Sequence, residues 1–477
     1  HRDLHSFPTR RSSDLAQTLF EKLWQDHRVC DAGDGADLLA IDRLLLHERT
    51  GGVALKSLLE NGYTVRDPSR VYAIMDHIVS FAEGRKRDDA RSPGGEAFIT
   101  ETRAMARSTG IHLIDTDSPE QGIVHVTAPE KGIVLPGFSV LCPDSHTCSL
   151  GALGAMAWGI GSSEAEHVMA TGVLRATKPQ QMRVSVIGEL QPGCSAKDIA
   201  LYLIAKHGAA GGKRCAIEFC GPVVGALSIE GRLTLCNMAV EFAAYSAIIA
   251  PDQKVLDFVL PRIDGSIDLS AAQKHWANLA TDSDANFDYE IEIDAREIAP
   301  QISWGTTPEE SFSLTENIPA NAASKALEYM GLTAGQSLAD LTIDGAFIGS
   351  CTNGRLSDLR SAAEILRGRR VPKHVRAVCV PGSKAVRREA EALGIDAIFK
   401  DAGFEWGEPG CAMCFYAGGE TFAPGARVVS STNRNFEGRQ GPGVRTHITS
   451  PAVVAACAVA GKICAPADLP VLEEAVV

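Results

Sequence analysis

Short runs of β-branched residues alternate along the chain with longer runs whose apolar positions recur at helical spacing. Residues 182–190 (MRVSVIGEL) are typical of a strand. Residues 345–350 (GAFIGS) predict another strand, followed by a loop and a helix over 356–368. A strand over 375–383 and a helix over 384–394 repeat that order. Because helix-length segments separate buried strands, the pattern predicts an α/β fold with parallel sheets.

The segment SPAVVAACAVAG predicts a helix with a signal at each end. Ser450 suits the N-cap, Pro451 the first turn and Gly461 the terminator. The best apolar run of the chain lies in this segment, and it is too short to cross a bilayer. The sequence therefore predicts no membrane span.

The chain of 477 residues is long enough for several domains. We place soft boundaries near residues 180 and 298, which gives α/β domains over 16–180, 181–297 and 298–477. Residues 308–324 are polar and turn-rich and predict a surface connection. Residues 1–15 resemble translated sequencing-adapter DNA rather than a signal peptide, and we interpret them as a foreign, disordered extension without chemistry.

Composition narrows the class of protein. Hydrophobic residues make up 45% of the chain and charged residues 22%, as in an ordinary globular protein. The net charge of −13 disfavours nucleic acid or an acidic membrane as the main partner. The thirteen cysteines are odd in number, and many lie in apolar runs, which predicts a reducing cytoplasm with most thiols buried.

Three cysteines are candidates for chemistry. Cys411 and Cys414 form a C-x-x-C pair, which can be a redox pair, half of a zinc site or two ligands of an iron–sulfur cluster. Cys351 follows a predicted strand and precedes a helix, where neighbouring amides favour a thiolate. Three thiolates suit a cluster with one iron left open, and an open metal position is what a catalytic Lewis acid needs.

Ionisable residues follow several apolar runs. Asp76 and His77 follow one, His125 lies in another that we expect to be a strand, and Asp144 and Ser145 lie on a predicted loop. Each alone would be a satisfied core or loop residue. Together with three candidate ligand thiols, they favour an acid–base site.

Two further pairs could line the same site. Asn237 and Glu241 are four residues apart and share a face if their segment is helical. Arg434 and Arg439 lie in a glycine-rich loop with Asn433, and paired guanidinium groups suit carboxylate binding. Surface positions would be the ordinary interpretation of such arginines without the other motifs.

The motifs together resemble the aconitase superfamily, in particular its leucine-pathway branch. The resemblance runs from about residue 19 to about residue 462, and it rests on seven motifs in the family's order: MDH, GIVH, PDSHT, CNMAVE, GSCTNGR, PGCAMC and STNRNFEGRQGPG. It implies three α/β/α domains around a central iron–sulfur site, without the family's fourth, swivelling domain. Cys351, Cys411 and Cys414 would hold one [4Fe–4S] cluster per subunit, with one iron not bound by protein.

The resemblance also implies a role for each remaining candidate. Asp76 and His77 would protonate the departing hydroxyl group, and His125, Asp144 and Ser145 would lie near the bound water. Glu241 would lie near the iron-bound water. The remaining candidates would line the cluster and substrate pocket: Asn237, Asn433, Arg434 and Arg439.

The implied activity is a hydro-lyase that isomerises 2- and 3-isopropylmalate by dehydration and rehydration in leucine biosynthesis. A separate small subunit with the swivel domain would supply the base in trans, because this chain ends shortly after the predicted helix at 450–461. Residues 415–418 (FYAG) depart from the family's common Leu-Ala-Met-Asn, so 2-methylmalate (citramalate) or another small 2-hydroxy diacid is an alternative substrate. A non-enzymatic iron-responsive, RNA-binding role is disfavoured by the acidic charge.

Overall fold

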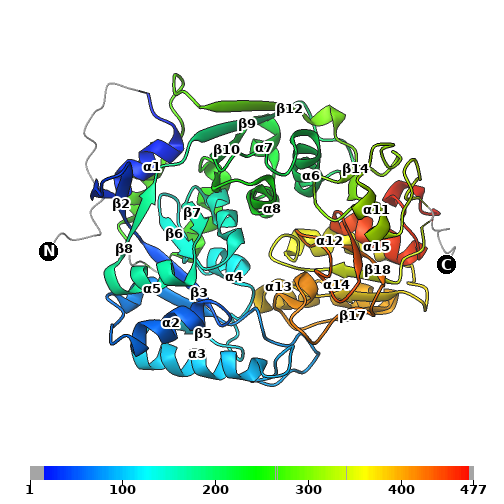
Figure 1. Cartoon of the computed structure of the whole chain (residues 1–477), viewed down its shortest axis with the longest axis horizontal. Coiled ribbons are helices and arrows are strands. Elements are labelled where there is room, and N and C mark those ends of the chain that lie inside the picture. The colour runs from blue at the N-terminus through cyan, green and yellow to red at the C-terminus, as the bar shows by residue number, and fades with distance from the viewer. Residues whose placement is uncertain (1–15, 264, 266, 340, 472–477) are drawn as a thin grey trace.

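Three parallel β-sheets, each accompanied by helices, form the body of the molecule in the computed structural model (Figure 1). The structure describes residues 16–263, 265, 267–339 and 341–471. The interpretation of residues 1–15 as a foreign extension lies outside the described residues. The parallel sheets confirm the predicted α/β class.

The first sheet has the strand order β5-β4-β3-β6-β7, and all of its neighbouring pairs are parallel. Its strands are β3 (Arg43–His47), β4 (Val71–Ile74), β5 (His112–Ile114), β6 (Ser139–Cys142) and β7 (Met156–Gly159). Its helices are α2 (Gly51–Glu60), α3 (Gly95–Thr109), α4 (Val124–Glu130) and α5 (Ser162–Thr171). The chain order reverses between β3 and β6, which is the kind of position where open α/β sheets bind ligands.

Helix α1 and a small antiparallel sheet accompany the first sheet. They are α1 (Leu19–His27), β1 (Arg28–Asp31), β2 (Ala36–Ala40) and β8 (Val173–Thr177). The second parallel sheet has the order β11-β10-β9-β12. Its strands are β9 (Gln181–Ile187), β10 (Ala216–Cys220), β11 (Ser246–Ile248) and β12 (Tyr289–Asp294). Its helices are α6 (Ala196–His207), α7 (Pro222–Ala226), α8 (Ile229–Met238), α9 (Gln253–Val259) and α10 (Leu269–Trp276).

The third sheet has the order β17-β16-β15-β18-β19 and is also parallel. Its strands are β15 (Gly345–Ile348), β16 (Arg376–Cys379), β17 (Phe404–Trp406), β18 (Arg427–Ser430) and β19 (Arg445–Ile448). Its helices are α11 (Ser324–Met330), α12 (Leu356–Leu366), α13 (Lys384–Ala392), α14 (Ile395–Ala402) and α15 (Pro451–Ala460). An antiparallel pair precedes it, β13 (Gln301–Ser303) and β14 (Ser311–Ser313). The chain order reverses between β15 and β18.

Several short 3-10 helices connect these elements, and three of them carry candidate residues. They are η1 (Pro68–Arg70), η2 (Ser145–Leu153), η3 (Ala239–Phe242), η4 (Leu260–Arg262), η5 (Ala295–Glu297), η6 (Ala412–Cys414) and η7 (Pro466–Asp468). Gly151 of η2 explains how closely this segment lies against β11, because a Cβ at this position would meet the carbonyl oxygen of Ala247 at 1.8 Å. The small residues before β7 therefore allow close backbone packing.

Most of the predicted elements are confirmed, with three corrections. The strand and helix predictions for residues 182–190 and 345–394 correspond to β9, β15, α12, β16 and α13. Helix α15 begins after Ser450 and ends at Gly461 with φ +68°, but the Ser450 hydroxyl makes no capping hydrogen bond. His125 lies in the first turn of α4, not in a strand. Residues 308–324 include strand β14 and so are more than a surface connection.

Buried apolar side chains form two large cores. One core is shared by the first and second sheets, and the other belongs to the third sheet. Each parallel sheet falls within one of the three predicted ranges, while the boundaries near residues 180 and 298 stay predictions. No helix in the part of the chain that the structure describes combines the length and apolarity needed to cross a membrane.

Candidate active site

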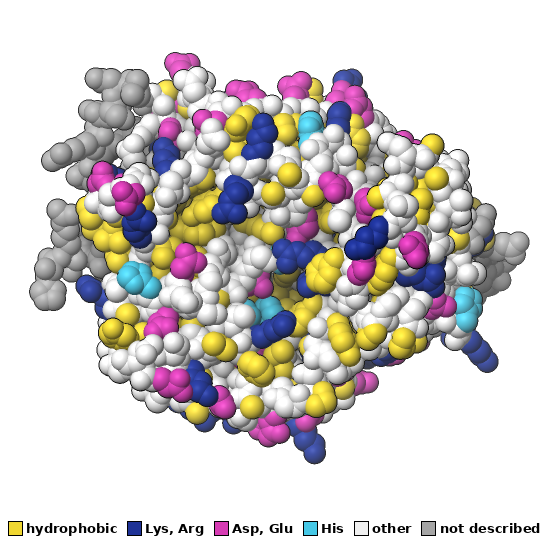
Figure 2. Space-filling view, in the orientation of Figure 1, with side chains coloured by type: hydrophobic (Ala, Val, Ile, Leu, Met, Phe, Trp, Pro, Cys, Tyr) yellow, Lys and Arg dark blue, Asp and Glu magenta, His cyan; other side chains and the backbone are white. Residues whose placement is uncertain are grey.

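The carboxyl ends of strands from the first and third sheets meet at the centre of the molecule. Acidic and imidazole side chains lie there at or just after the ends of neighbouring strands β4, β3 and β6, and the loops after β15, β17 and β18 carry thiols, amides and guanidinium groups. The second sheet contributes through α8 and η3. The space-filling view shows a hollow between these parts, with basic and histidine side chains at its mouth (Figure 2). The site is therefore assembled by all three sheets.

The three candidate cysteines lie together in two buried loops. Cys351 follows β15 and is 7% exposed, and Cys411 and Cys414 in the loop after β17 are each 6% exposed. The Ser350 hydroxyl joins the loops, at 3.3 Å from the Cys414 sulfur and 3.9 Å from the Cys351 sulfur. All thirteen cysteines of the chain are free thiols. Three sulfur atoms of free cysteines thus lie together as possible metal ligands.

The backbone beside the thiols is strained. Ser350, directly before Cys351, has φ +82°, and Ala412, directly after Cys411, has φ +46°. Residues with side chains rarely adopt the left-handed region, and each such residue costs about 1–3 kcal/mol. Strain at both cysteine loops is typical of a functional site that the surrounding fold holds in place.

The three thiols differ in acidity. Burial raises the pKa of Cys414, but the Arg439 guanidinium and the Ser350 hydroxyl outweigh it and bring the pKa below that of an ordinary thiol. Burial and the neighbouring Cys414 raise the pKa of Cys351 to about 12. Burial and Asp76 raise the pKa of Cys411 well above its usual value. At Cys351, burial therefore outweighs the amides that were expected to favour a thiolate.

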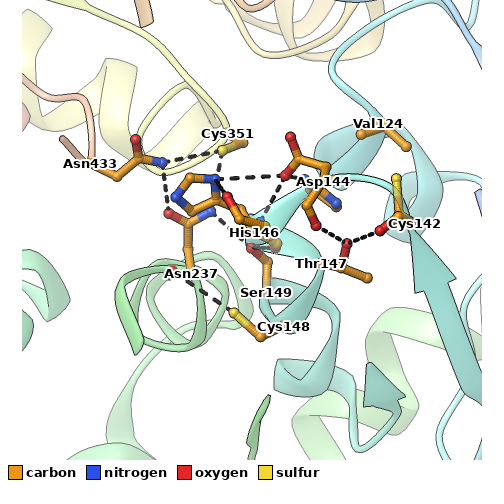
Figure 3. A network of polar contacts seen from close by, with 12 residues as sticks. Val124, Cys142, Asp144, His146, Thr147, Cys148, Ser149, Asn237, Cys351 and Asn433 are labelled. Carbon is orange, nitrogen blue, oxygen red and sulfur yellow. Dashed lines mark hydrogen bonds and ion pairs between the residues drawn. The ribbon is translucent and has the colours of Figure 1, made fainter. Parts of the chain in front are cut away.

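An amide network surrounds the Cys351 sulfur, as Figure 3 shows. The Asn237 side chain donates to this sulfur at 3.2 Å, and the Asn433 side chain donates to it at 3.5 Å. Asn433 also donates to the Asn237 carbonyl oxygen at 3.2 Å. Two side-chain amides from different sheets therefore face one thiol, where they would stabilise its deprotonated form.

His77 is held between two carboxylates. Its Nδ1 lies 2.5 Å from the Asp76 carboxylate, and its Nε2 lies 3.2 Å from the Asp144 carboxylate. Burial lowers the pKa of His77, but Asp76 and the other anions around it raise that pKa well above its ordinary value. Asp76 is fully buried, and its other oxygen accepts from the backbone N–H of Val124 at 2.8 Å. The surroundings of His77 therefore hold its ring in place and favour its protonated form.

Two residues at the end of β3 belong to the site although they are absent from the sequence-based candidates. The His47 ring stacks on the His77 ring with centroids 3.7 Å apart. Glu48 is fully buried and accepts hydrogen bonds from the backbone N–H groups of Asp76 and Ile78. A His-Glu pair directly after a predicted apolar strand is the signal that could have identified them.

Glu241 links the second sheet to the basic loop after β18. One of its oxygens accepts from His146 Nε2 at 3.1 Å and from Arg434 Nε at 2.8 Å. Arg434 also donates to the Ser145 hydroxyl at 3.0 Å. Burial raises the pKa of Glu241, but His146 and Arg434 outweigh burial and lower it. His146, which the sequence-based candidates omit, is therefore the partner that keeps this carboxylate ionised.

Asn237 and Glu241 reach the site from different elements. Helix α8 ends at Met238, and Glu241 lies in η3, so the segment is not one regular helix. The change from α to 3-10 geometry still leaves both side chains directed to the site, at Cys351 and at His146 respectively. Asn237 and Glu241 thus both point into the site, as predicted, although the segment that carries them is not one regular helix.

Three acid–base side chains of the site each have a buried atom without a partner among the described residues. The atoms are Nδ1 of His47, Nε2 of His125 and Oε2 of Glu241. His125 is 1% exposed, its Nδ1 lies 3.7 Å from the Asp144 carboxylate, and burial lowers its pKa to about 4. Because buried polar atoms are almost always paired, these atoms indicate a polar ligand or water in the site.

Lys197 of α6 is a further residue of the site that sequence reasoning missed as a candidate. Its ammonium group is fully buried and donates to the carbonyl oxygens of Ser431 and Thr432 and to the Asn353 side chain. Burial lowers its pKa to about 7. Lys197 therefore ties the second sheet to the Cys351 loop and to the loop that carries Asn433.

Arg439 completes the surroundings of the thiols. Its guanidinium donates to the Cys414 sulfur at 3.6 Å, and its buried Nε has no partner in the part of the chain that the structure describes. The structure thus brings all thirteen candidate residues into one region, although their individual roles stay predictions.

Comparisons with known proteins identify the family of this chain. Residues 21–461 match the aconitase family (aconitate hydratase). The chain is 47% identical over 460 residues to 3-isopropylmalate dehydratase large subunit 1 of Bradyrhizobium diazoefficiens, a match that covers 94% of this chain and 96% of the relative. Aconitase X of Thermococcus kodakaraensis, in its holo form, aligns with 83% of this chain and 84% of its own at 14% identity and a TM-score of 0.45. By the family match and the close relative, the chain belongs to the aconitase family and has its α/β fold.

Proposed function

We propose that this chain is the large subunit of an aconitase-type hydro-lyase that interconverts 2-isopropylmalate and 3-isopropylmalate in leucine biosynthesis. The observation that carries the proposal is the meeting of thiol and acid: the Cys411 sulfur lies 3.7 Å from His77 Nδ1, in a loop that also holds Cys414. The name of the relative at 47% identity supports the choice of substrate.

The residues present fit the iron–sulfur cluster that the family implies. Cys351, Cys411 and Cys414 are soft sulfur ligands in a buried setting, and amides of Asn237 and Asn433 face one of them. We assign a [4Fe–4S] cluster to these three thiols, with one iron free of protein ligands. When bound, the cluster would supply a Lewis acid that polarises a substrate C–O bond.

His77 is suited to protonate the departing hydroxyl group. Hydroxide is a poor leaving group, so a positioned acid is needed. Asp76 fixes the ring through Nδ1, so that Nε2 is the nitrogen that can deliver a proton. Asp144 lies 3.2 Å from this nitrogen, and the substrate hydroxyl would take its place.

Glu241 and His125 are suited to accept protons from water. Glu241 keeps one oxygen for His146 and Arg434, and its other oxygen has no partner among the described residues. His125, with a pKa near 4, is neutral and offers an Nε2 that is equally free there. Water that returns to the double bond in the second half-reaction would lose its proton to one of these atoms. The same proton would then pass to His77, which gave one up in the first half-reaction.

The carbon-bound proton needs a further base, and we assign it to a separate small subunit. The relative is named a large subunit, which supports the existence of such a partner. Arg434 and Arg439 would attract the dianionic substrate against the net charge of −13. The reaction would take place in the cytoplasm, on a small 2-hydroxy dicarboxylate.

The test is anaerobic co-expression with the small subunit, followed by turnover of a panel of malate derivatives. We expect a cluster absorbance, and we expect the two isopropylmalates to have the highest kcat/KM of the panel. If citramalate had a higher kcat/KM, it would replace the isopropylmalates as the substrate and the chemistry would stay. A large subunit that turns over by itself would contradict the assignment of the base to the partner.

A further inference from the structure

Arg49 is a guanidinium group at the site that no acidic side chain in the described part of the chain neutralises. It lies two positions after His47, at the carboxyl end of β3, and its side chain is exposed. Among the residues that the structure describes, Arg49 has no hydrogen bond or ion pair. Its guanidinium lies over the ring of Phe415, whose centroid is 4.8 Å from Arg49 Cζ.

Phe415 places this guanidinium beside the acid of the site. The ring is 8% exposed, and its centroid lies 5.8 Å from that of the His77 imidazole. It directly follows Cys414 in the chain. Arg91 and Arg439 also lie over this ring, at 4.7 and 5.7 Å from its centroid. The ring of Phe415 therefore lies close to both the exposed Arg49 guanidinium and the imidazole of His77.

The other guanidinium groups near Phe415 already donate to protein atoms. Arg91 is buried and donates to the carbonyl oxygens of His77 and Phe415. Arg439 donates to the Cys414 sulfur. Arg434, elsewhere in the site, donates to Glu241 and Ser145. Of these four arginines, only Arg49 keeps all of its N–H groups for a ligand.

We propose that Arg49, held by the ring of Phe415, binds the substrate carboxylate that is remote from the departing hydroxyl group. This inference rests on the proposed function and deepens it, because it makes Arg49 and Phe415 determinants of substrate class. A cation–π contact uses the face of the ring and leaves the guanidinium edge free, and that edge matches a carboxylate with two parallel hydrogen bonds. The site would therefore select 2-hydroxy dicarboxylates over 2-hydroxy monocarboxylates.

The test compares two ligands in the cluster-loaded complex with the small subunit. The dicarboxylate is 3-isopropylmalate, which carries the remote carboxylate. The monocarboxylate is 2-hydroxy-4-methylpentanoate, the same molecule without that group, used as a competitive inhibitor. For Arg49→Gln we expect the KM of the dicarboxylate to rise about 10- to 100-fold with kcat changed by less than about threefold. The inhibition constant of the monocarboxylate should stay unchanged, because this ligand has no group for Arg49.

Three variants sharpen the comparison. Phe415→Leu removes the ring that orients Arg49 and should raise the KM of the dicarboxylate by a smaller factor than Arg49→Gln. Arg49→Lys keeps the charge without the planar fork and should recover only part of the affinity. Arg360→Gln changes an exposed arginine on α12 and should leave the binding of both ligands unaffected.

Three results would overturn the inference. They are an unchanged KM in Arg49→Gln, an equal loss of affinity for both ligands, and a loss explained by weaker binding of the small subunit in analytical ultracentrifugation. Calorimetric titration of both ligands separates this inference from the proposed function. A complex that binds 3-isopropylmalate through Arg49 but does not convert it would contradict the function and support the inference.

Discussion

The imidazole rings of His47 and His77 stack with centroids 3.7 Å apart and planes 14° apart, yet their pKa values are shifted in opposite directions. Burial lowers the pKa of His47, and the charge on His77 lowers it further, to about 3. Burial acts on His77 in the same direction, but Asp76 reverses the effect and raises the pKa of His77. A carboxylate on one side of a stacked pair thus decides which ring is the acid.

Asp76→Asn should therefore remove the acid without changing the shape of the site. The amide cannot stabilise an imidazolium as a carboxylate does, so the proton on His77 loses its main support. We expect kcat to fall by about 10²- to 10⁴-fold while KM changes little. Steady-state kinetics of the complex, with cluster absorbance as a check on loading, measures this.

The matched control is Asp34→Asn, which changes a carboxylate that is 98% exposed. Its kcat should equal that of the parent chain. If Asp76→Asn retained full kcat, His77 would not be the proton donor, and Asp76 would be a structural residue only.

Replacing any one of the three ligand cysteines by serine should abolish cluster binding. Cys351→Ser, Cys411→Ser and Cys414→Ser each remove a soft sulfur that a buried hydroxyl does not replace as an iron ligand. We expect loss of the visible absorbance and of bound iron after anaerobic reconstitution.

Cys379→Ser is the control, since Cys379 is fully buried at the end of β16 in the same sheet. It should bind iron normally. Zinc instead of iron in the parent chain, or a cluster that survives Cys351→Ser, would contradict the assigned ligand set.

Lys197→Met should destabilise the fold around the thiol loops. The substitution keeps the apolar stem but leaves the carbonyl oxygens of Ser431 and Thr432 and the Asn353 side chain without a donor. We expect the free energy of unfolding to fall by about 2–4 kcal/mol. Urea denaturation of the cluster-free chain measures the change, with the exposed Lys178→Met as a control; a shift of the same size in both variants would exclude this role.

The buried His447 should make the protein less stable in acid. Burial, together with Arg427, lowers its pKa to about 3, well below the ordinary value of 6.5. The unfolded chain binds a proton at this position below pH 6.5 and the folded chain does not, so stability is present above pH 6.5 and is lost as the pH falls. Between pH 6.5 and 5 this residue should account for about 2 kcal/mol.

His447→Asn should therefore give a shallower loss of stability with falling pH, although it is less stable than the parent at pH 7. The variant loses a hydrogen bond to the Ser303 carbonyl oxygen and one from Arg427. Denaturant midpoints across this pH range test the slope, and His167→Asn on the exposed face of α5 is the control. Parallel curves for His447→Asn and the parent would show that another group titrates.

The sequence predicted the helices, the strands and the residues of the site better than it predicted the pKa values of those residues. Periodicity identified β9, β15 and α12, because a buried strand and an amphipathic helix each leave a characteristic spacing of apolar side chains. The same reasoning placed His125 in a strand, because a short apolar run has no period that separates a buried strand from a buried helix. The sequence predicted amides that favour a thiolate at Cys351, but it did not predict the burial that raises the pKa of this thiol. A sequence shows the neighbours of a residue in the chain and not how deeply the residue is buried.

The amino-acid sequence by itself determined the α/β class, the family and the set of side chains available for chemistry, since motifs and apolar spacing are local properties of the chain. Only the tertiary structure decided which of those side chains meet. His47 and Glu48 joined the site because β3 lies between β4 and β6, and Arg49 lies over Phe415, which comes from a loop more than 360 residues away in the chain. Charge states followed the same rule, because the pKa of a buried group depends on neighbours that only the folded chain brings within a few ångströms.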